Sequence, residues 1–389
     1  MAHSAVKGCF AAKGYIRGPF GSALKRGDML DTGIPVYEQQ HAIYGSRQFR
    51  FHISENKYME MKRFSIQPDD IIISCSGTVG RVSIITKDDP IGIISQALLL
   101  LRVNVDIIDP LFLCYFFRSY EGYNAIVSRS SGSVQVNISK REVIEQIPLR
   151  LPDIQTQRRI VSILNSLDQK IVCNAKINDN LQQQASALYG KYFPYAITDD
   201  LPTGWRIGTG GEIVEIHDSK RIPLSGAQRA KMEKRTYPYY GAASLMDYVD
   251  EYIFYGKYLL LGEDGTVVDD AGYPVLQYVW GQFWVNNHAH ILTGKNGFNV
   301  ESLLLLFKRT PVKSIVTGAV QPKISQANLR SIQVVIPPQP KLDAFNALIR
   351  PLFDQIRQNQ DQNKALAAMR DVLLPKLMSG EVDISSIHL

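Results

Sequence analysis

The sequence predicts an α+β (mixed α/β) protein organised as a pseudo-twofold tandem repeat, with two globular domains separated by two long helices that form an antiparallel coiled coil. Three observations lead to this fold class. A short phrase recurs about half a chain length later, a coiled-coil seam follows each copy, and strand-like and helix-like segments precede each copy. The predicted segments are a first domain at 1–152, a central long helix at 153–192, a second domain at 193–337, and a C-terminal long helix with its tail at 338–389.

The repeated phrase is the first sign of duplication. It reads SGSVQVNIS at 131–139 and TGAVQPKIS at 317–325, so Ile138 and Ile324 occupy matching places 186 residues apart. After each copy comes a short apolar stretch that ends in proline, first IPLRLP and then IQVVIPP. Because a chain of 389 residues is long for a single hydrophobic core, two or more domains are the expected organisation.

Strand-like runs with turn signals precede each copy of the phrase. The segments DDIIISCSGTVGRVSII (69–85) and GKYLLLGEDGTVV (256–268) both contain Gly-Thr-Val, which begins at Gly77 and at Gly265. A second apolar segment follows in each half, and after it a predicted helix, DPLFLCYFFRSY in the first half and VESLLLLFKRT in the second. Each half therefore predicts a mixed α/β domain, and LPTGW at 201–205 is typical of a linker into the second one.

Each half ends in a long polar segment with a regular apolar stripe. The stripe advances in alternating steps of four and three residues, which is the a/d seam of a coiled coil sustained over about four heptads. The seam of the first copy consists of Ile160, Leu164, Leu167, Ile171, Asn174, Asn178, Leu181, Ala185 and Leu188. The seam of the second copy consists of Phe345, Ile349, Leu352, Ile356, Asn359, Asn363, Leu366, Arg370 and Leu373.

Both seams carry two asparagines at matching positions, and asparagine in a seam fixes register at a cost in stability. In an antiparallel pair the residue numbers of partners have a constant sum, and a sum of 537 sets Asn174 opposite Asn363 and Asn178 opposite Asn359. A parallel pairing also matches asparagine with asparagine. The segment between the helices is long enough for a whole domain to connect their ends, which favours the antiparallel pairing. Two amphipathic helices packed on separate cores are the alternative.

Composition bounds the class of protein. Hydrophobic residues make up 45% of the chain and charged residues 21%, which is ordinary for a globular protein. The N-terminus lacks the pattern of a secretory signal, and the most apolar run is shorter than a membrane span. The cysteines at 9, 75, 114 and 173 are scattered without C-x-x-C spacing, so we expect neither a metal site nor a disulfide framework, and we expect a cytoplasmic location. The net charge of +6 permits a polyanionic partner without demanding one.

Motifs for catalysis are hard to find in the sequence. There is no P-loop pattern and no [DNS]-P-P-[YFW] motif of amino-group methyltransferases, and GTGGE at 208–212 lacks the strand–helix context of a nucleotide loop. His288 and His290 flank Ala289, where a metal or base role competes with the simpler interpretation of a strand with both side chains on one face. We therefore expect no catalytic residue and no metal, and the sequence favours binding over chemistry.

A basic run in the second domain indicates contact with nucleic acid. The run KRIPLSGAQRAKMEKR carries its positive charges at Lys220, Arg221, Arg229, Lys231, Lys234 and Arg235. Lysine and arginine suit DNA phosphates, and the neighbouring Tyr239 and Tyr240 are candidates for contacts with bases. A solvated charged face, with the tyrosines packed in a sheet, is the alternative.

The turns and the repeated phrases complete the predicted DNA-binding set. Small polar loops let backbone N–H groups approach phosphates closely. Gln135 and Gln321 stand at matched places, where they either read adenine or cap a turn. The other candidates are Ser76, Thr78, Arg81, Ser131, Ser133, Thr266 and Lys323.

Taken in order, these segments resemble the specificity subunit of type I restriction-modification systems. The resemblance is carried by the repeated pair SGSVQVNIS…IPLRLPDIQTQRRIVSILNSLDQKI and TGAVQPKIS…VVIPPQPKLDAFNALIRPLFDQI, and by KRIPLSGAQR, YPYYGA, GEDGTVV, VLQYVWGQFWVNNHAHIL and LLPKLMSGEV in the second half. The first domain departs from the usual opening, which resembles LPTGW, and begins MAHSAVKGCFAAKGY instead. We therefore expect its first strand to be shortened or remodelled.

The resemblance implies two target-recognition domains, each of which reads one half of a bipartite site in double-stranded DNA. The paired helices would set the unread gap and dock two modification (methyltransferase) subunits, and restriction (motor nuclease) subunits would complete the assembly. The chain itself would hold no cofactor, since S-adenosylmethionine, ATP and Mg²⁺ are expected on the partner subunits.

Two other classes of function stay open on the residues alone. A stand-alone DNA methyltransferase or nuclease with unrecognised motifs would bind S-adenosylmethionine or cut DNA without partners. A coiled-coil scaffold protein would show no salt-dependent binding to duplex DNA.

Overall fold

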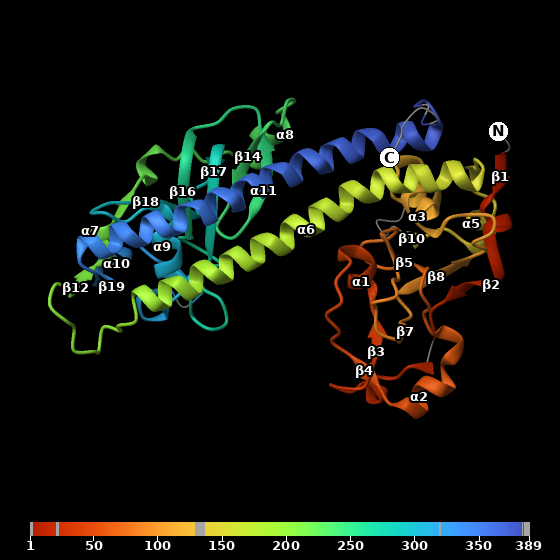
Figure 1. Ribbon diagram of the computed structural model, residues 1–389, viewed down its shortest axis with the longest axis horizontal. Coiled ribbons are helices and arrows are strands. Elements are labelled where there is room, and N and C mark those ends of the chain that lie inside the picture. Colours follow the sequence, from red (N-terminus) through yellow and green to blue (C-terminus); the bar gives the residue numbers. More distant parts are fainter. Residues whose placement is uncertain (1–2, 21–22, 129–136, 319, 383, 385–389) are drawn as a thin grey trace. The chain divides into compact units, whose positions relative to one another are not determined.

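The computed structural model describes the chain except for residues 1–2, 21–22, 129–136, 319, 383 and 385–389. The chain forms two compact units: unit 1 comprises Met1–Val172 and Gln362–Leu389, and unit 2 comprises Cys173–Asp361. Both long helices, α6 (Ile154–Tyr192) and α11 (Gln339–Ser379), begin in one unit and end in the other (Figure 1). The division into four segments predicted from the sequence is finer than this division and stays a prediction.

Unit 1 is built on antiparallel strands in the order β2-β8-β5-β6. Their bounds are β2 Phe10–Arg17, β8 Leu98–Val103, β5 Ile71–Ser74 and β6 Val82–Ile84. A smaller sheet has the order β4-β3-β7, with β3 Ile34–Tyr37, β4 His52–Ile53 and β7 Ile93–Ile94. Short ladders join β1 (His3–Ala5) to β11 (Pro148–Arg150) and β9 (Val127–Ser128) to β10 (Asn137–Ile138).

Unit 2 contains one continuous sheet in the order β13-β18-β16-β17-β14-β15. Its strands are β13 Val214–Ile216, β14 Tyr237–Tyr240, β15 Leu245–Val249, β16 Phe254–Gly262, β17 Leu276–Val285 and β18 Ala289–Gly294. A short ladder joins β12 (Arg206–Thr209) to β19 (Gln333–Ile336), in the place that β1 and β11 hold in unit 1.

The two units repeat one strand topology. In unit 2, β17 pairs antiparallel with β16 along its length and parallel with β14 near its end. In unit 1 two shorter strands share these roles, because β6 pairs antiparallel with β5 and β7 pairs parallel with β3. The predicted tandem repeat of mixed α/β domains is therefore confirmed. The first strand is short, as the sequence indicated: β1 has three residues and β12 has four.

Helices cover the sheets and fill the core of each unit. Unit 1 contains α1 (Gln39–Tyr44), α2 (Glu55–Glu60), α3 (Pro110–Arg118), α4 (Tyr120–Ile126) and α5 (Arg141–Glu145). Unit 2 contains α7 (Gly210–Ile213), α8 (Gly226–Ala230), α9 (Val300–Phe307) and α10 (Gln326–Ser331). The predicted helices α3 and α9 begin at N-caps, since Asp109 accepts from the N–H groups of the first turn of α3 and Asn299 forms a capping box with Ser302.

The seams of α6 and α11 pair antiparallel in the predicted register. Asn359 Nδ2 donates to Asn178 Oδ1 at 2.8 Å, and the two residue numbers have the predicted sum of 537. Asn178 Nδ2 donates in turn to the carbonyl oxygen of Ile356, and Asn363 Nδ2 donates to that of Ile171, each at 3.2 Å. Asn174 is fully buried on α6. The antiparallel coiled coil is thus confirmed, and the buried Asn178–Asn359 pair defines its register.

One carboxylate in each unit fastens the helices to the globular part. In unit 1, Asp168 on α6 accepts from Tyr115 Oη at 2.9 Å and from Arg370 Nη1 on α11 at 2.8 Å. This ion pair explains why the second seam contains an arginine. In unit 2, the buried Glu301 on α9 accepts from Lys257 at 2.7 Å and from Arg357 on α11 at 3.1 Å. Each contact joins a helix end to its own unit by charge as well as by apolar packing.

Replacement of the buried asparagine pair tests the register. A single Asn178→Leu change leaves the Asn359 amide without its partner and should lower the free energy of unfolding by about 1–3 kcal/mol. The double change to leucine exchanges a buried polar pair for apolar packing, so it should recover most of that loss or exceed the wild-type stability. Urea unfolding of both variants, with Lys176→Leu on the exposed side of α6 as control, measures the difference. Additive losses from the two single changes would contradict the pairing.

Candidate nucleic-acid interface

A tight turn between β5 and β6 presents the predicted residues of unit 1. Ser74 Oγ donates to the Thr78 carbonyl at 2.5 Å and accepts from the Arg81 N–H at 3.0 Å, which closes the turn. Gly77 and Gly80 have φ of +62° and +80°, which favours glycine at both positions. Ser76, Thr78 and Arg81 are consequently brought together and exposed.

The arginine of this turn is oriented by an aromatic ring. The Arg81 guanidinium lies over the Tyr123 ring at 5.3 Å, and Ser76 Oγ donates to Gln39 Oε1 at 3.3 Å. A guanidinium stacked in this way keeps its N–H groups available for a phosphate or for guanine. The other predicted residues of unit 1, Ser131, Ser133 and Gln135, lie outside the described residues.

Two loops of unit 2 meet at one rim and carry Thr266, Gln321 and Lys323. The Gly265 N–H donates to the Pro322 carbonyl at 2.9 Å, and Gln321 Nε2 donates to Asp264. Thr317 and Lys323 exchange backbone hydrogen bonds of 2.8 and 2.7 Å, which folds the repeated phrase into a closed loop. Thr266, Gln321 and Lys323 are all exposed, and we refer to this edge, formed by residues 264–266, 317–318 and 320–323, as the unit 2 rim.

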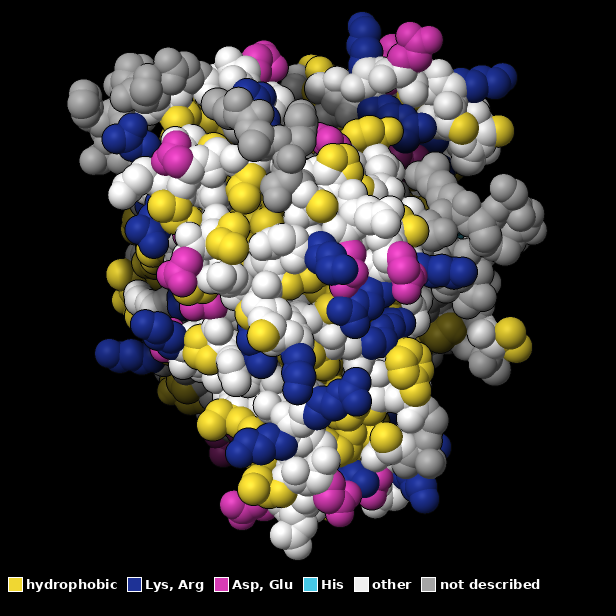
Figure 2. Space-filling model, turned by 90° about the vertical axis from the view of Figure 1, so that its right-hand side faces the viewer, with side chains coloured by type: hydrophobic (Ala, Val, Ile, Leu, Met, Phe, Trp, Pro, Cys, Tyr) yellow, Lys and Arg dark blue, Asp and Glu magenta, His cyan; other side chains and the backbone are white. Residues whose placement is uncertain are grey.

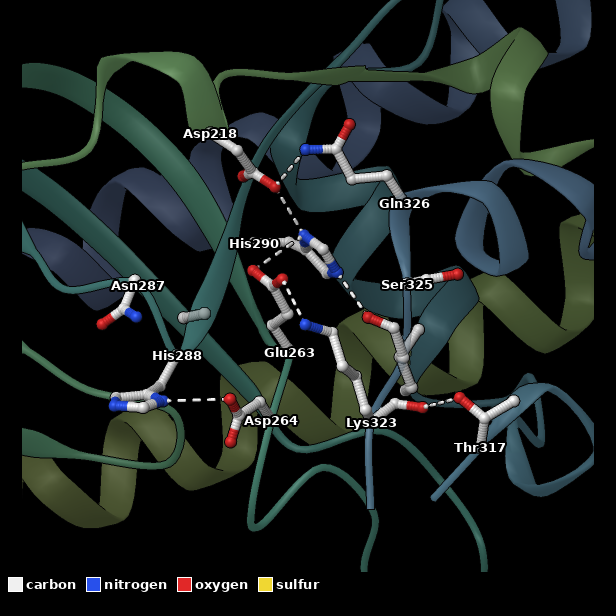
Figure 3. Close-up of polar contacts among 12 residues, drawn as sticks. Asp218, Glu263, Asp264, Asn287, His288, His290, Thr317, Lys323, Ser325 and Gln326 are labelled. Carbon is white, nitrogen blue, oxygen red and sulfur yellow. Dashed lines mark hydrogen bonds and ion pairs between the residues drawn. The ribbon is translucent and has the colours of Figure 1, made fainter. Parts of the chain in front are cut away.

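A buried polar network lies beneath the unit 2 rim (Figure 3). His290 on β18 is fully buried, and its Nδ1 lies 2.6 Å from Asp218 Oδ2 while its Nε2 lies 2.8 Å from the Ile324 carbonyl oxygen. Both ring nitrogens of His290 are therefore engaged by oxygen atoms inside the unit. The histidine thereby ties the end of the repeated phrase to the sheet.

Two acids and two bases complete the network. Glu263 pairs with Arg221 at 2.5 Å and with Lys323 at 3.4 Å, while Asp218 accepts from Gln326 Nε2 at 2.7 Å. Burial alone would raise the pKa of Asp218, but the hydrogen bond and charge of His290 hold it below its ordinary value. The buried carboxylate is therefore ionised and neutralised inside the unit.

Three residues of the network carry groups that can ligate metals, but their polar atoms are engaged with one another and with Arg221. One ligand atom each from Asp218, Glu263 and His290 lies within 4.8 Å of the others. However, both nitrogens of His290 are engaged with acceptors, and Arg221 pairs with both acids, at 2.5 Å to Glu263 and 3.4 Å to Asp218. His288, by contrast, lies at the rim with its Nδ1 3.4 Å from Asp264, so the two histidines do not share one face.

The basic run of unit 2 is divided between surface and interior. Lys220 and Lys231 are exposed, as a phosphate contact requires. Arg221 also donates to the Ala289 carbonyl at 2.9 Å, and Arg229 pairs with Asp247 at 3.1 Å. Both arginines are thus engaged inside the fold, which differs from the predicted phosphate contact.

The predicted tyrosines pack within unit 2. The Tyr239 side chain is 1% exposed, and its hydroxyl accepts from the Leu224 N–H at 3.1 Å. Tyr240 is half-buried against Phe283, and burial raises its pKa above the ordinary value. The structure gives both residues a packing role within β14, which is the alternative that tyrosine-rich strands allow.

The sequence did not predict a basic hollow that the structure shows in unit 1. Four cationic side chains and one carboxylate line a hollow of about 530 Å³ beside Tyr15. The cations are Arg17, Arg63, Lys140 and Arg141, and the carboxylate is Glu142. Figure 2 shows lysine and arginine side chains gathering across the middle of this face of unit 1. These cationic residues come from three distant parts of the sequence and form no basic run, so no local sequence pattern predicts the hollow.

The fold and these surfaces define a class of protein: a duplicated nucleic-acid-recognition module carried on a coiled coil. The family model described as "Type I restriction modification DNA specificity domain" matches the chain twice, at residues 27–183 and 202–364. The chain belongs to this family. It is therefore a DNA-recognition component of a type I restriction-modification system and not a catalytic one.

Named relatives agree with this assignment. The specificity subunit of the type I restriction enzyme MjaIX from Methanocaldococcus jannaschii is 22% identical over 308 residues, which cover 71% of this chain and 70% of that protein. The specificity subunit of the enzyme EcoprrI from Escherichia coli is 25% identical over 279 residues, which cover 69% and 67%. The crystal structure of a type I restriction-modification system S subunit from M. genitalium has the same fold, with a TM-score of 0.60, 15% identity, and coverage of 97% of this chain and 96% of that one.

Within the described part of the chain, no helix has both the length and the apolar content that a membrane span requires.

The buried network makes a prediction about stability and pH. Because the folded-state pKa of Asp218 is depressed, its contribution to stability is present above about pH 4, the unfolded value, and is lost as the pH falls through the folded value. Asp218→Asn should therefore lower the free energy of unfolding by about 3 kcal/mol at neutral pH, and the deficit should shrink below about pH 4. Denaturant unfolding across pH measures it, with the exposed Asp270→Asn as control. An equal deficit at neutral and strongly acid pH would contradict the network.

Proposed function

We propose that the chain selects a bipartite double-stranded DNA site for its restriction-modification system, with one half-site read by each unit. The observation that supports this proposal is the repeat of one strand topology, with exposed polar loops at equivalent strand ends in both units. The turn with Ser76, Thr78 and Arg81 would contact one half-site, and the unit 2 rim would contact the other. The helical pairing is antiparallel, as expected of a protein that presents two half-sites in opposite orientation.

The individual contacts follow from the side chains that are exposed. Arg81 suits a guanine edge or a phosphate, Gln321 suits an adenine edge, and Lys220 and Lys323 suit phosphates. Lys323 is held by Glu263 at 3.4 Å, so its ammonium group is positioned at the rim, and its side chain is still 49% exposed. Arg221, Arg229 and Tyr239 act from inside the unit by holding the loops in place.

We further propose that two methyltransferase subunits and the restriction subunits assemble around this chain. S-adenosylmethionine, ATP and Mg²⁺ would then belong to these partners, and this chain would contribute sequence selection alone. The pseudo-twofold repeat supports two equivalent docking sites, so that the two strands of the DNA are each served by one methyltransferase.

Methylation mapping tests the half-site assignment. The chain is co-expressed with its neighbouring modification gene, and methylated adenines are mapped over the host genome. Arg81→Ala should relax or abolish recognition at one half of the motif and leave the other half unchanged, because a lost bidentate contact costs about 1–3 kcal/mol of discrimination. Gln321→Ala should affect the opposite half. A change in both halves from either variant would contradict independent reading, and the exposed Lys87→Ala serves as control.

The paired helices should determine the unread gap between the half-sites. One heptad inserted after Leu181 and one before Ile356 keep the seam in phase and lengthen each helix by about 10 Å. At about 3.4 Å per base pair, the gap should grow by about 3 base pairs while both half-site sequences stay the same. Such a change also rotates the duplex by roughly a third of a turn, so weaker binding is expected. The methylated motif is the readout, and unchanged spacing would show that partner subunits set the gap.

A further inference from the structure

The basic hollow of unit 1 is formed by segments that are equivalent to those of the buried network in unit 2. Arg17 at the end of β2 corresponds to Asp218, which follows β13. Lys140 and Arg141 follow Ser139 in unit 1, and Gln326 follows the matching Ser325 in unit 2. Arg17 also lies beside Cys75, which precedes Ser76 as Glu263 precedes Asp264. The two units therefore share a frame at this place but fill it with different side chains.

The charges in the hollow are only partly compensated within the unit, because Glu142 also lines it and Arg141 is paired with Glu145. Among the described residues, no carboxylate lies within 4 Å of Arg17, Arg63 or Lys140, whereas Arg141 pairs with Glu145 at 2.6 Å. Nη1 of Arg17 is buried and no described hydrogen-bond acceptor reaches it. Unit 2 behaves in the opposite way, because Asp218 and Glu263 there compensate the nearby cations.

Aromatic rings hold the guanidinium groups of the hollow in place. Arg141 lies over the Tyr15 ring at 4.9 Å, Arg63 over Phe64 at 5.4 Å, and Arg17 over Phe20 at 5.8 Å. Stacking leaves the in-plane N–H groups free to bind oxygen atoms. Burial raises the pKa of Tyr15 to about 12, so its hydroxyl keeps its proton at neutral pH. The hollow thus offers oriented donors and positive charge.

We propose that this hollow binds backbone phosphates of the duplex whose bases are read by the turn that contains Arg81. The inference rests on the proposed function and adds a second, sequence-independent contact to it. DNA is favoured over an acidic protein surface because the hollow adjoins two predicted DNA-contacting segments: Arg17 lies beside Cys75 at the start of the turn, and Ile138 and Lys140 line it at the end of the repeated phrase. Phosphate contacts fix the position of a protein on DNA without reading its sequence.

The salt dependence of DNA binding tests the hollow directly. The full chain binds a fluorescent random-sequence duplex, and the slope of log affinity against log salt concentration counts phosphate contacts at about 0.9 each. The variant Arg63→Gln/Lys140→Gln should have a slope smaller by about 2, so a fourfold rise in salt should weaken its binding roughly tenfold less than that of the wild type. Both side chains are exposed, so the fold should tolerate the change.

Controls separate failure of this inference from failure of the proposed function. Arg26→Gln/Lys87→Gln removes the same charge from exposed positions outside the hollow and should keep nearly the wild-type slope. A wild-type chain without salt-dependent binding would sink the proposed function itself. If the salt slope of the hollow variant equals that of the control variant, the phosphate assignment is wrong. The assignment is also wrong if the hollow variant binds DNA as the wild type does but no longer co-purifies with the methyltransferase, because the hollow would then bind a protein partner. The methylated motif should stay the same in the hollow variant.

Discussion

The register between α6 and α11 is the constraint on which the rest of the structure depends. The Asn178–Asn359 pair lies in the buried seam, and any slip of one helix would leave amide groups buried without partners. The same register brings Arg370 to Asp168 within unit 1. In unit 2, Arg357 of α11 reaches Glu301 beneath the sheet. The asparagine pair thus fixes the register of the two helices, and ion pairs attach α11 to Asp168 in unit 1 and to Glu301 in unit 2.

The two units show how one frame supports two polar interiors. In unit 2, His290, two acids and Arg221 form a buried polar network that holds the carbonyl group of Ile324. In unit 1 the equivalent place holds Cys75 and Arg17, and the positive charge is left to the surface. At this place the strands of the two units are equivalent, and the side chains on them differ. A shared backbone with different polar side chains in the two units suits a protein that recognises two different DNA half-sites.

Periodic features could be predicted from the sequence, and non-local ones could not. The heptad steps predicted both helices and their register, and the matched phrases predicted the repeat, because each is encoded by neighbouring residues. The basic run gave no such guidance: it could not show that Arg221 and Arg229 turn inward, since their partners Glu263 and Asp247 lie elsewhere in the chain. Tyr239 was misplaced for the same reason. The hollow forms where three segments meet: β2 with Arg17, the segment after α2 with Arg63, and α5 with Arg141. Contacts between segments so far apart in the sequence cannot be predicted from local patterns.

The division of one long strand into β6 and β7 has a consequence for how the protein can diversify. In unit 2, β17 carries the sheet without interruption, so any change of length there would disturb the pairing on both sides. In unit 1, residues 85–92 interrupt the equivalent path, and β7 meets β3 at the pairs Val36–Ile93 and Tyr37–Ile94. A change of length beside the exposed Lys87 and Asp88 would spare both ladders, whereas Ile85, Asp89 and Pro90 are bonded to neighbouring segments. Unit 1 therefore possesses a position between β6 and β7 at which the length of the chain can change while the β2-β8-β5-β6 sheet keeps its pairing.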